Sequence, residues 1–219
     1  MPVRGNDETA PAKADPVGRP RRGAGTGTGT YDHRVPPRPP LLLRPLVRDD
    51  EEQALAAEHE LATEGFDFLV GREGRPFGWY VDRCEANRQG RDLPPGHVPA
   101  TFLVGVVDGD LVGRVSVRHR LNEHLTHVGG HIGYGVRPAY RRRGYATAML
   151  REALAIARDL GIEAALVTCA DTNAASAGVV ERCGGVLQDV VEHDGSRVRR
   201  YLVPTAGRVP SQPSGPAAA

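Results

Sequence analysis

The most regular alternation of apolar and polar residues lies between Gly144 and Leu160. Apolar side chains recur there every three or four positions, which is the spacing of one face of an α-helix. Gly161 follows directly and supplies the glycine at which helices commonly end. The pattern predicts an amphipathic helix whose buried face carries Ala146, Met149, Leu150, Ala153, Ala157 and Leu160.

Shorter patterns predict the remaining elements. Two apolar runs flank the turn Asp108-Gly109-Asp110, as in a β-hairpin, and a second hairpin is expected around Asp194-Gly195. Asp49 or Asp50 is expected to cap an early helix, with acidic residues in its first turn. The order of elements predicts a mixed α/β sheet with helices on both faces. Strands are expected over about 41–48, 101–107, 111–117, 131–136, 164–168, 186–192 and 197–203, helices over about 50–63, 76–88, 144–160 and 173–183, and a loop over 119–130.

The two ends of the chain differ in composition from the rest. Residues 1–40 are dominated by Pro, Gly, Thr, Ala and Arg, and residues 205–219 have the same character. Such segments bury too little apolar surface to offset the entropy that is lost on ordering. We therefore expect two disordered tails around one folded domain, residues 41–204.

Charge and cysteine content exclude several classes of protein. The 219 residues include 28 basic and 27 acidic ones, so net charge favours neither nucleic acid nor a membrane surface as partner. No segment has the composition of a secretory signal, and no apolar run approaches the roughly 18 residues of a membrane span. Cys84, Cys169 and Cys183 are odd in number and lack metal-ligand spacing. The sequence predicts a soluble cytoplasmic protein with reduced cysteines and no metal site.

Candidate chemistry is concentrated where the strand that ends at Val136 leads into the helix that begins near Gly144. The first turn of a helix leaves N–H groups unpaired and carries about half a positive charge. Gly144 and Ala146 leave room for a bulky anion, and the arginines at 141–143 add positive charge. The pattern favours a phosphate or pyrophosphate site. The alternative is a basic helix start that faces only solvent, or an RNA-facing patch.

The segment from Arg141 to Ala146 resembles the Q/R-x-x-G-x-G/A signature of the GNAT acetyltransferase superfamily, and it follows a V-x-P strand end as in that family. A second block, from Asn173 to Gly185, resembles the family's N-x-x-S stretch with its later E-x-x-G. One helix and one strand lie between the blocks, as that fold requires. The resemblance covers about residues 41–203 and is specific over 131–186. It implies a central mixed sheet of about six or seven strands flanked by about four helices, with acetyl-CoA as co-substrate and no metal.

The resemblance also implies how the co-substrate would bind. The edge of the strand that ends at Val136 would hydrogen-bond the pantetheine arm, and the N–H groups from Arg142 to Thr147 would hold the pyrophosphate. Asn173 would lie near the pantetheine or the sulfur, although capping the next helix is a simpler role for it. The implied cofactor-binding residues are Tyr134, Gly135, Val136, Arg141, Arg142, Arg143, Gly144, Tyr145, Ala146, Thr147, Asn173 and Ser176.

Two positions depart from the family pattern. Val180 replaces the tyrosine that in many members protonates the leaving thiolate, and Gly185 replaces the phenylalanine that usually closes the second block. The catalytic groups must then lie elsewhere, and the candidates are Glu123, His131 and Tyr134. Each candidate has a structural alternative, namely surface charge for the glutamate, a strand position for the histidine and packing for the tyrosine.

The sequence therefore favours an acetyl-CoA-dependent N-acetyltransferase that transfers the acetyl group directly to a primary amine of a small molecule or a protein. The missing tyrosine motivates a second hypothesis, a GNAT-fold module that binds acyl-CoA as a sensor without catalysis. A nucleic-acid-binding protein is a third, weakened by the balanced charge and by the lack of a basic surface with stacking aromatic residues. The sequence is compatible with a homodimer, and it does not identify the acceptor.

Overall fold

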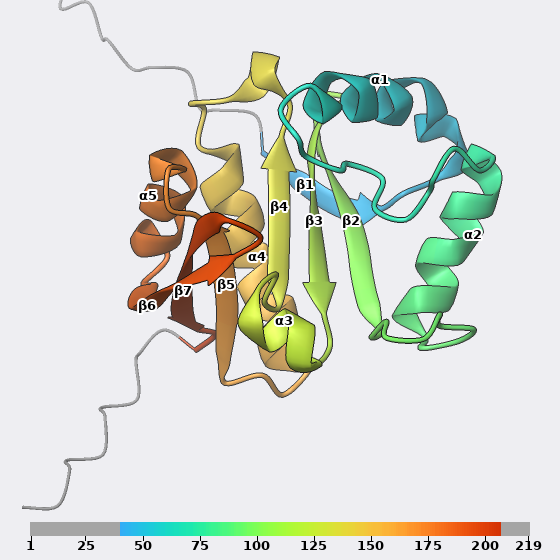
Figure 1. Cartoon of the computed structure of the whole chain (residues 1–219). Coiled ribbons are helices and arrows are strands. Elements are labelled where there is room, and N and C mark those ends of the chain that lie inside the picture. Colours follow the sequence, from blue (N-terminus) through green and yellow to red (C-terminus); the bar gives the residue numbers. More distant parts are fainter. Residues whose placement is uncertain (1–39, 207–219) are drawn as a thin grey trace, which may run out of the picture. The chain divides into compact units, whose positions relative to one another are not determined.

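The computed structural model describes residues 40–206, and the two expected tails lie outside this range apart from residues 40, 205 and 206. The described residues form seven strands and five α-helices, with short 3-10 turns at Arg48–Asp50 and Pro138–Tyr140 (Figure 1). The strands are β1 (Leu42–Pro45), β2 (Ala100–Val107), β3 (Asp110–Arg118), β4 (Ile132–Val136), β5 (Ala164–Ala170), β6 (Val186–His193) and β7 (Ser196–Pro204). The helices are α1 (Glu51–Ala62), α2 (Phe77–Arg88), α3 (Glu123–His127), α4 (Tyr145–Asp159) and α5 (Ala174–Arg182).

The strands form two antiparallel sheets, ordered β1-β2-β3-β4 and β5-β7-β6. All predicted strands and helices are present, and the α/β class is confirmed. The structure has two sheets where the sequence predicted one, because β4 and β5 diverge instead of forming a ladder. The predicted loop at 119–130 is also wrong in part, since it contains α3, whose N-cap Asn122 accepts a hydrogen bond from the N–H of Leu125 at 2.8 Å.

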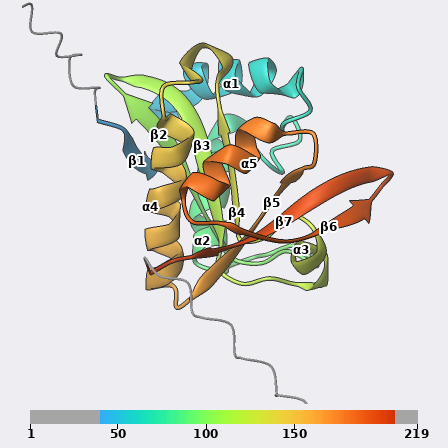
Figure 2. The same cartoon turned by 90° about the vertical axis from the view of Figure 1, so that its left-hand side faces the viewer.

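Both faces of the four-stranded sheet are covered by helices (Figures 1 and 2). Alternate residues of β2 show this, because Leu103 belongs to the core formed with α4 and α5, whereas Val104 belongs to the core formed with α1 and α2. The amphipathic pattern predicted for 144–160 is confirmed in α4, whose Met149, Leu150 and Ala153 are fully buried. The helices therefore hold β4, the strand that leads to the candidate site, between two packed layers.

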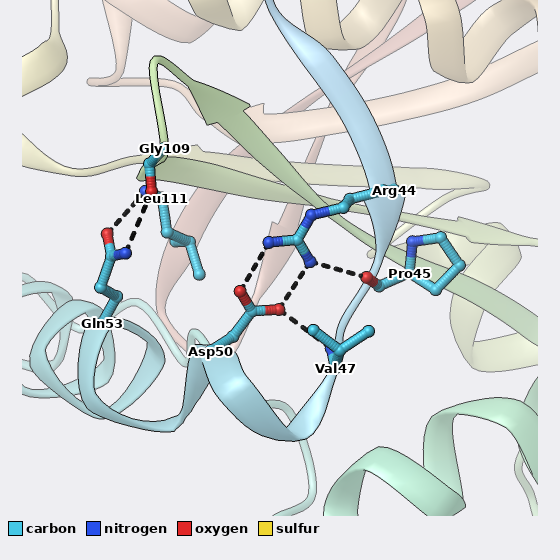
Figure 3. A network of polar contacts seen from close by, with 7 residues as sticks. All are labelled: Arg44, Pro45, Val47, Asp50, Gln53, Gly109 and Leu111. Carbon is cyan, nitrogen blue, oxygen red and sulfur yellow. Dashed lines mark hydrogen bonds and ion pairs between the residues drawn. The ribbon is translucent and has the colours of Figure 1, made fainter.

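Asp50 is a buried carboxylate that ties β1 to the start of α1 (Figure 3). It does not cap α1 with its side chain, contrary to the prediction. Its oxygens instead accept two hydrogen bonds from the guanidinium of Arg44, at 2.6 and 2.7 Å, and one from the N–H of Val47 at 2.9 Å. One turn further along α1, Gln53 bonds the Leu111 N–H and the Gly109 carbonyl of the β2–β3 turn. These contacts fix α1 against the sheet.

Replacing Asp50 with Asn is expected to destabilise the fold by about 2 kcal/mol at pH 7, because it removes the buried charge of a partly buried ion pair. Burial raises the pKa of the Asp50 carboxyl, but the hydrogen bonds from Arg44 and Val47 and the charge of Arg44 outweigh it and hold that pKa below its usual value. The stabilisation is therefore present above about pH 3.9 and is lost as the pH falls through the lower folded pKa.

Thermal unfolding of D50N and of the matched neighbour variant D49N between pH 3 and pH 7 measures this difference. Asp49 is exposed, so D49N is expected to change stability by less than about 0.5 kcal/mol. The cost of D50N should shrink toward pH 3. Equal stability of the two variants at pH 7 would show that the Arg44 ion pair contributes nothing.

Candidate functional site

The N-terminus of α4 is an open, electropositive turn. Gly144 precedes the helix with φ +86°, in the left-handed region that glycine adopts without strain. The first backbone hydrogen bond of the helix runs from the N–H of Ala148 to the Gly144 carbonyl at 3.1 Å. Within residues 40–206, the N–H groups of Tyr145, Ala146 and Thr147 have no backbone acceptor. Three donors at a helix start are therefore available to an anion.

A cavity of about 380 Å³, open to solvent, lies directly on this turn. Three arginines reach it from different elements, which are the turn before α4, the second turn of α4 and the end of α5. The sequence predicted only the first of the three. Arg151 lies one helical turn after Thr147, so this spacing is the only signal in the sequence that places it here. The cavity is lined by Leu41, Arg143, Gly144, Tyr145, Thr147, Ala148, Arg151 and Arg182.

Arg141 of the motif and the nearby Arg137 have carboxylate partners. Arg141 donates to both oxygens of Glu64, at 2.6 and 2.9 Å, and to the Val136 carbonyl at 3.0 Å. Arg137 binds Glu60 in the same bidentate way, at 2.6 and 2.9 Å. Arg142 is exposed and has φ +61°. Arg141 thus anchors the turn to the end of α1, and its charge is balanced by a carboxylate.

β4 and β5 separate next to this turn. β4 pairs with β3 along one edge and is the last strand of its sheet. His131 forms the connection to β5, because its N–H donates to the Leu166 carbonyl at 2.7 Å and its Nδ1 accepts from the Leu166 N–H at 2.9 Å. A neutral imidazole bonded in this way carries its proton on Nε2. Burial, and then the charge of Arg118, lower the pKa of His131. This geometry gives His131 a structural role at the junction and no free lone pair for a base.

Tyr134 spans the gap between β4 and α5. Its hydroxyl lies 3.0 Å from Ser176 Oγ and 3.4 Å from the Ser176 carbonyl oxygen. Burial raises the pKa of Tyr134 to about 12, although the bond with Ser176 opposes this. The hydroxyl therefore keeps its proton at neutral pH. Burial also raises the pKa of Cys169 on β5, which argues against a thiolate nucleophile there.

The glycines of β4 lie on the opposite face of the strand from Tyr134. A Cβ added to Gly135 would lie 2.5 Å from Phe66 Cζ, so the α1–α2 segment packs directly on the backbone of β4. A Cβ added to Gly133 would meet only the guanidinium groups of Arg114 and Arg118, at 3.7 and 3.8 Å. The sequence motif gave no indication of either contact.

The second block forms α5. Asn173 is its N-cap, as expected for the simpler of its two roles, and accepts from the Ser176 N–H at 2.9 Å. Val180 is fully buried, and a Cβ added to Gly185 would lie 2.5 Å from Val180 Cγ1. The two departures from the family pattern are thus in contact with each other. The valine occupies the space that a side chain at 185 would need.

The structure places the remaining candidates as follows. Glu123 is the exposed first residue of α3, and among the described residues no hydrogen bond or ion pair joins it to His131 or Tyr134. The side chain of Tyr145 is buried with Val107 and Val112, and the residue also lines the cavity. Within residues 40–206, no group of three or more His, Cys, Asp or Glu residues could hold a metal ion. No helix in this part of the chain combines the length and the apolar character that crossing a membrane requires.

The profile of the Acetyltransferase (GNAT) family matches residues 66–185, which is more than half of the chain. The chain belongs to the GNAT acetyltransferase family. The match begins at Phe66 and ends at Gly185, so it contains the β4–β5 divergence, the α4 turn and the second block. No curated protein sequence matches the chain significantly.

Solved structures share the GNAT fold. A proposed acetyltransferase from Salmonella typhimurium, yncA, determined with acetyl-CoA, is 15% identical with a TM-score of 0.55, and the alignment covers 78% of this chain and 96% of that one. The microcin C7 self-immunity acetyltransferase MccE, determined with acetyl-CoA and AMP, is 15% identical with a TM-score of 0.56, over 75% and 92%. A proposed phosphinothricin N-acetyltransferase is 20% identical with a TM-score of 0.51, over 76% and 99%.

Proposed function

We propose that this protein transfers the acetyl group of acetyl-CoA directly to a primary amine of a small molecule or a protein. The observation that carries the proposal is the α4 turn, where three N–H groups without a backbone acceptor lie at the helix start beside a cavity lined by arginines. This combination suits a pyrophosphate, since helix N-termini and guanidinium groups both favour anions. The solved relatives that contain acetyl-CoA support the same ligand.

The pantetheine arm would follow the free edge of β4 toward the junction at His131. β4 is an edge strand on that side, so an extended ligand can add to it as a further strand does. Tyr134, Gly135 and Val136 would contact the arm. Asn173 and Ser176, at the start of α5, would lie beside its sulfur end.

Tyr134 is the group proposed as general acid. The amine nitrogen attacks the thioester carbonyl carbon, the C–S bond breaks, and the departing thiolate takes the hydroxyl proton of Tyr134. The proton that the amine loses passes to water, and water returns a proton to the Tyr134 oxygen, which restores the acid. Tyr134 packs against the core cluster that contains Val180, the residue at the position of the usual tyrosine. The Tyr134 hydroxyl would supply the proton that this tyrosine supplies in other family members.

Acetyl-CoA is expected to raise the thermal midpoint of the protein. A ligand that binds only the folded state stabilises it by about 1.4 kcal/mol at a tenfold excess over its Kd. Differential scanning fluorimetry with acetyl-CoA, CoA and free pantetheine measures this shift, and pantetheine serves as the control that lacks the pyrophosphate. Free-thiol release from acetyl-CoA over a panel of amines then distinguishes the enzyme from the sensor. A midpoint that no CoA compound moves would remove the basis for the proposal.

A further inference from the structure

Two arginines of β3 converge on the face of β4 that lies opposite Tyr134. Gly133 has no side chain, and the position where its Cβ would lie is 3.7 Å from Arg114 Nη1 and 3.8 Å from Arg118 Nη1. Arg114 and Arg118 are four residues apart on one strand, so their side chains project from the same face. Both guanidinium groups therefore reach the same place beside the centre of β4.

Neither guanidinium has a carboxylate partner within residues 40–206, although Arg137 and Arg141 on neighbouring segments both have one. Arg114 is only 5% exposed. Its hydrogen bonds go to the carbonyls of Gly133 and Asp67, and its Nε is buried without a partner. Among the described residues, the Arg118 guanidinium donates to the carbonyls of Gly129 and Gly130 alone. Carbonyl oxygens satisfy donors but do not neutralise charge, so within residues 40–206 neither desolvated cation is held in an ion pair. The Asp67 charge acts on Arg114, but its effect is smaller than that of the Arg118 charge.

The surroundings of Arg114 are aromatic. Its guanidinium lies 4.5 Å from the ring centre of Phe66 and 5.8 Å from that of Phe102. Burial lowers the pKa of Arg114 to about 10, with a further decrease from the charge of Arg118 and opposing effects of Tyr80 and Asp67. At neutral pH Arg114 nevertheless remains a cation, held next to a second cation. Such an arrangement is stabilised when an anion binds between the two.

We propose that Arg114 and Arg118 bind the carboxylate of the acceptor, so that the substrate is a small amine that also carries a carboxylate, as an amino acid does. This inference rests on the acetyl-transfer function proposed above and names its substrate class. Guanidinium groups bind carboxylates through two parallel hydrogen bonds, and Arg114 still has an unused donor. Phe66 and Asp67, from the segment between α1 and α2, border this face, since Phe66 packs on the Gly135 backbone and the Asp67 carbonyl accepts from Arg114. The acceptor would thus approach β4 from the α1–α2 side, while the thioester lies at the β4–β5 gap.

The test uses reaction products, so it does not depend on turnover. Calorimetry measures the binding of N-acetyl-amino acids with different side chains, and of the corresponding N-acetyl-amino acid amides, to the full-length protein in the presence of CoA. We expect at least one N-acetyl-amino acid to bind at least tenfold more tightly than its amide. R118Q should reduce this ratio to near one, whereas the matched control R120Q, which removes an exposed arginine two residues further on, should preserve it.

R114K provides a second variant in case the removal of Arg114 impairs folding, since it keeps the charge and loses the planar fork. It should lower the ratio while the thermal midpoint stays within a few degrees of the parent protein. Equal binding of acids and amides by the parent protein would overturn the inference, and so would a ratio that R118Q leaves unchanged. Either result, in a protein that acetyl-CoA stabilises, leaves the proposed transfer function standing. Absence of that stabilisation would instead contradict the proposed function.

Discussion

Y134F is expected to lower kcat by about 100-fold while the Kd for acetyl-CoA changes little. A positioned general acid contributes about 10²–10⁴-fold, and Tyr134 is the hydroxyl that spans the β4–α5 gap. The substitution keeps the ring that packs against the core and removes only the proton donor. Steady-state kinetics on an acceptor from the amine panel, together with calorimetry for acetyl-CoA, separates the two quantities.

The pH profile of the parent enzyme provides an independent test of this role. A tyrosine acts as an acid only while it is protonated, and burial raises the pKa of Tyr134 to about 12. The rate should therefore rise with pH as the acceptor amine loses its proton, without a descending limb between about pH 8.5 and pH 10. Y140F is the matched control, because the Tyr140 hydroxyl donates to Asp110 at 3.0 Å, away from α5. Full turnover in Y134F would assign the acid to another group or to water.

Local sequence patterns predicted most of the fold. The helix at 145–159 and the two hairpins depend on residues that are close in sequence, so periodicity and turn residues were sufficient to locate them. The helix α3 was missed because its five residues are too few to show a period. The division into two sheets was missed as well. It depends on how β4 and β5 lie relative to each other, and His131 and Leu166, whose bonds join the two strands without a ladder, are 35 positions apart in the chain.

In the candidate site, too, local features could be predicted from the sequence, whereas features that depend on packing could not. The glycine at 144 and the unbonded N–H groups after it could be predicted, because a helix start is a local feature. Arg151 and Arg182 could not, since their places in the cavity depend on how α4 and α5 pack. The pairing of Arg141 with Glu64 could not be predicted from the sequence either, because the two residues are 77 positions apart. Gly144 also lies before the helix, so a helix-forming residue at this position would be strained by its positive φ.

A substitution inside the helix therefore tests the anion site better than one at Gly144. Thr147 is the third residue of α4 and lines the cavity, and T147E places a carboxylate beside the proposed pyrophosphate. A unit charge about 4 Å from another costs about 4 kcal/mol at an effective dielectric constant of about 20. We expect the Kd for acetyl-CoA to rise by at least about 100-fold. Folding should not suffer, because an acidic side chain in the first turn opposes the helix dipole favourably.

T147Q is the matched control, since glutamine has the shape of glutamate without its charge. It should weaken acetyl-CoA binding by much less than T147E, and the difference between the two variants isolates electrostatic repulsion from steric blocking. The difference should also shrink as ionic strength rises, because salt screens charges that are exposed to solvent. Free pantetheine, which carries no phosphate, should bind both variants equally. Equal Kd values of T147E and T147Q for acetyl-CoA at low salt would place the pyrophosphate away from the start of α4, and the assignment of the cavity would fail with it.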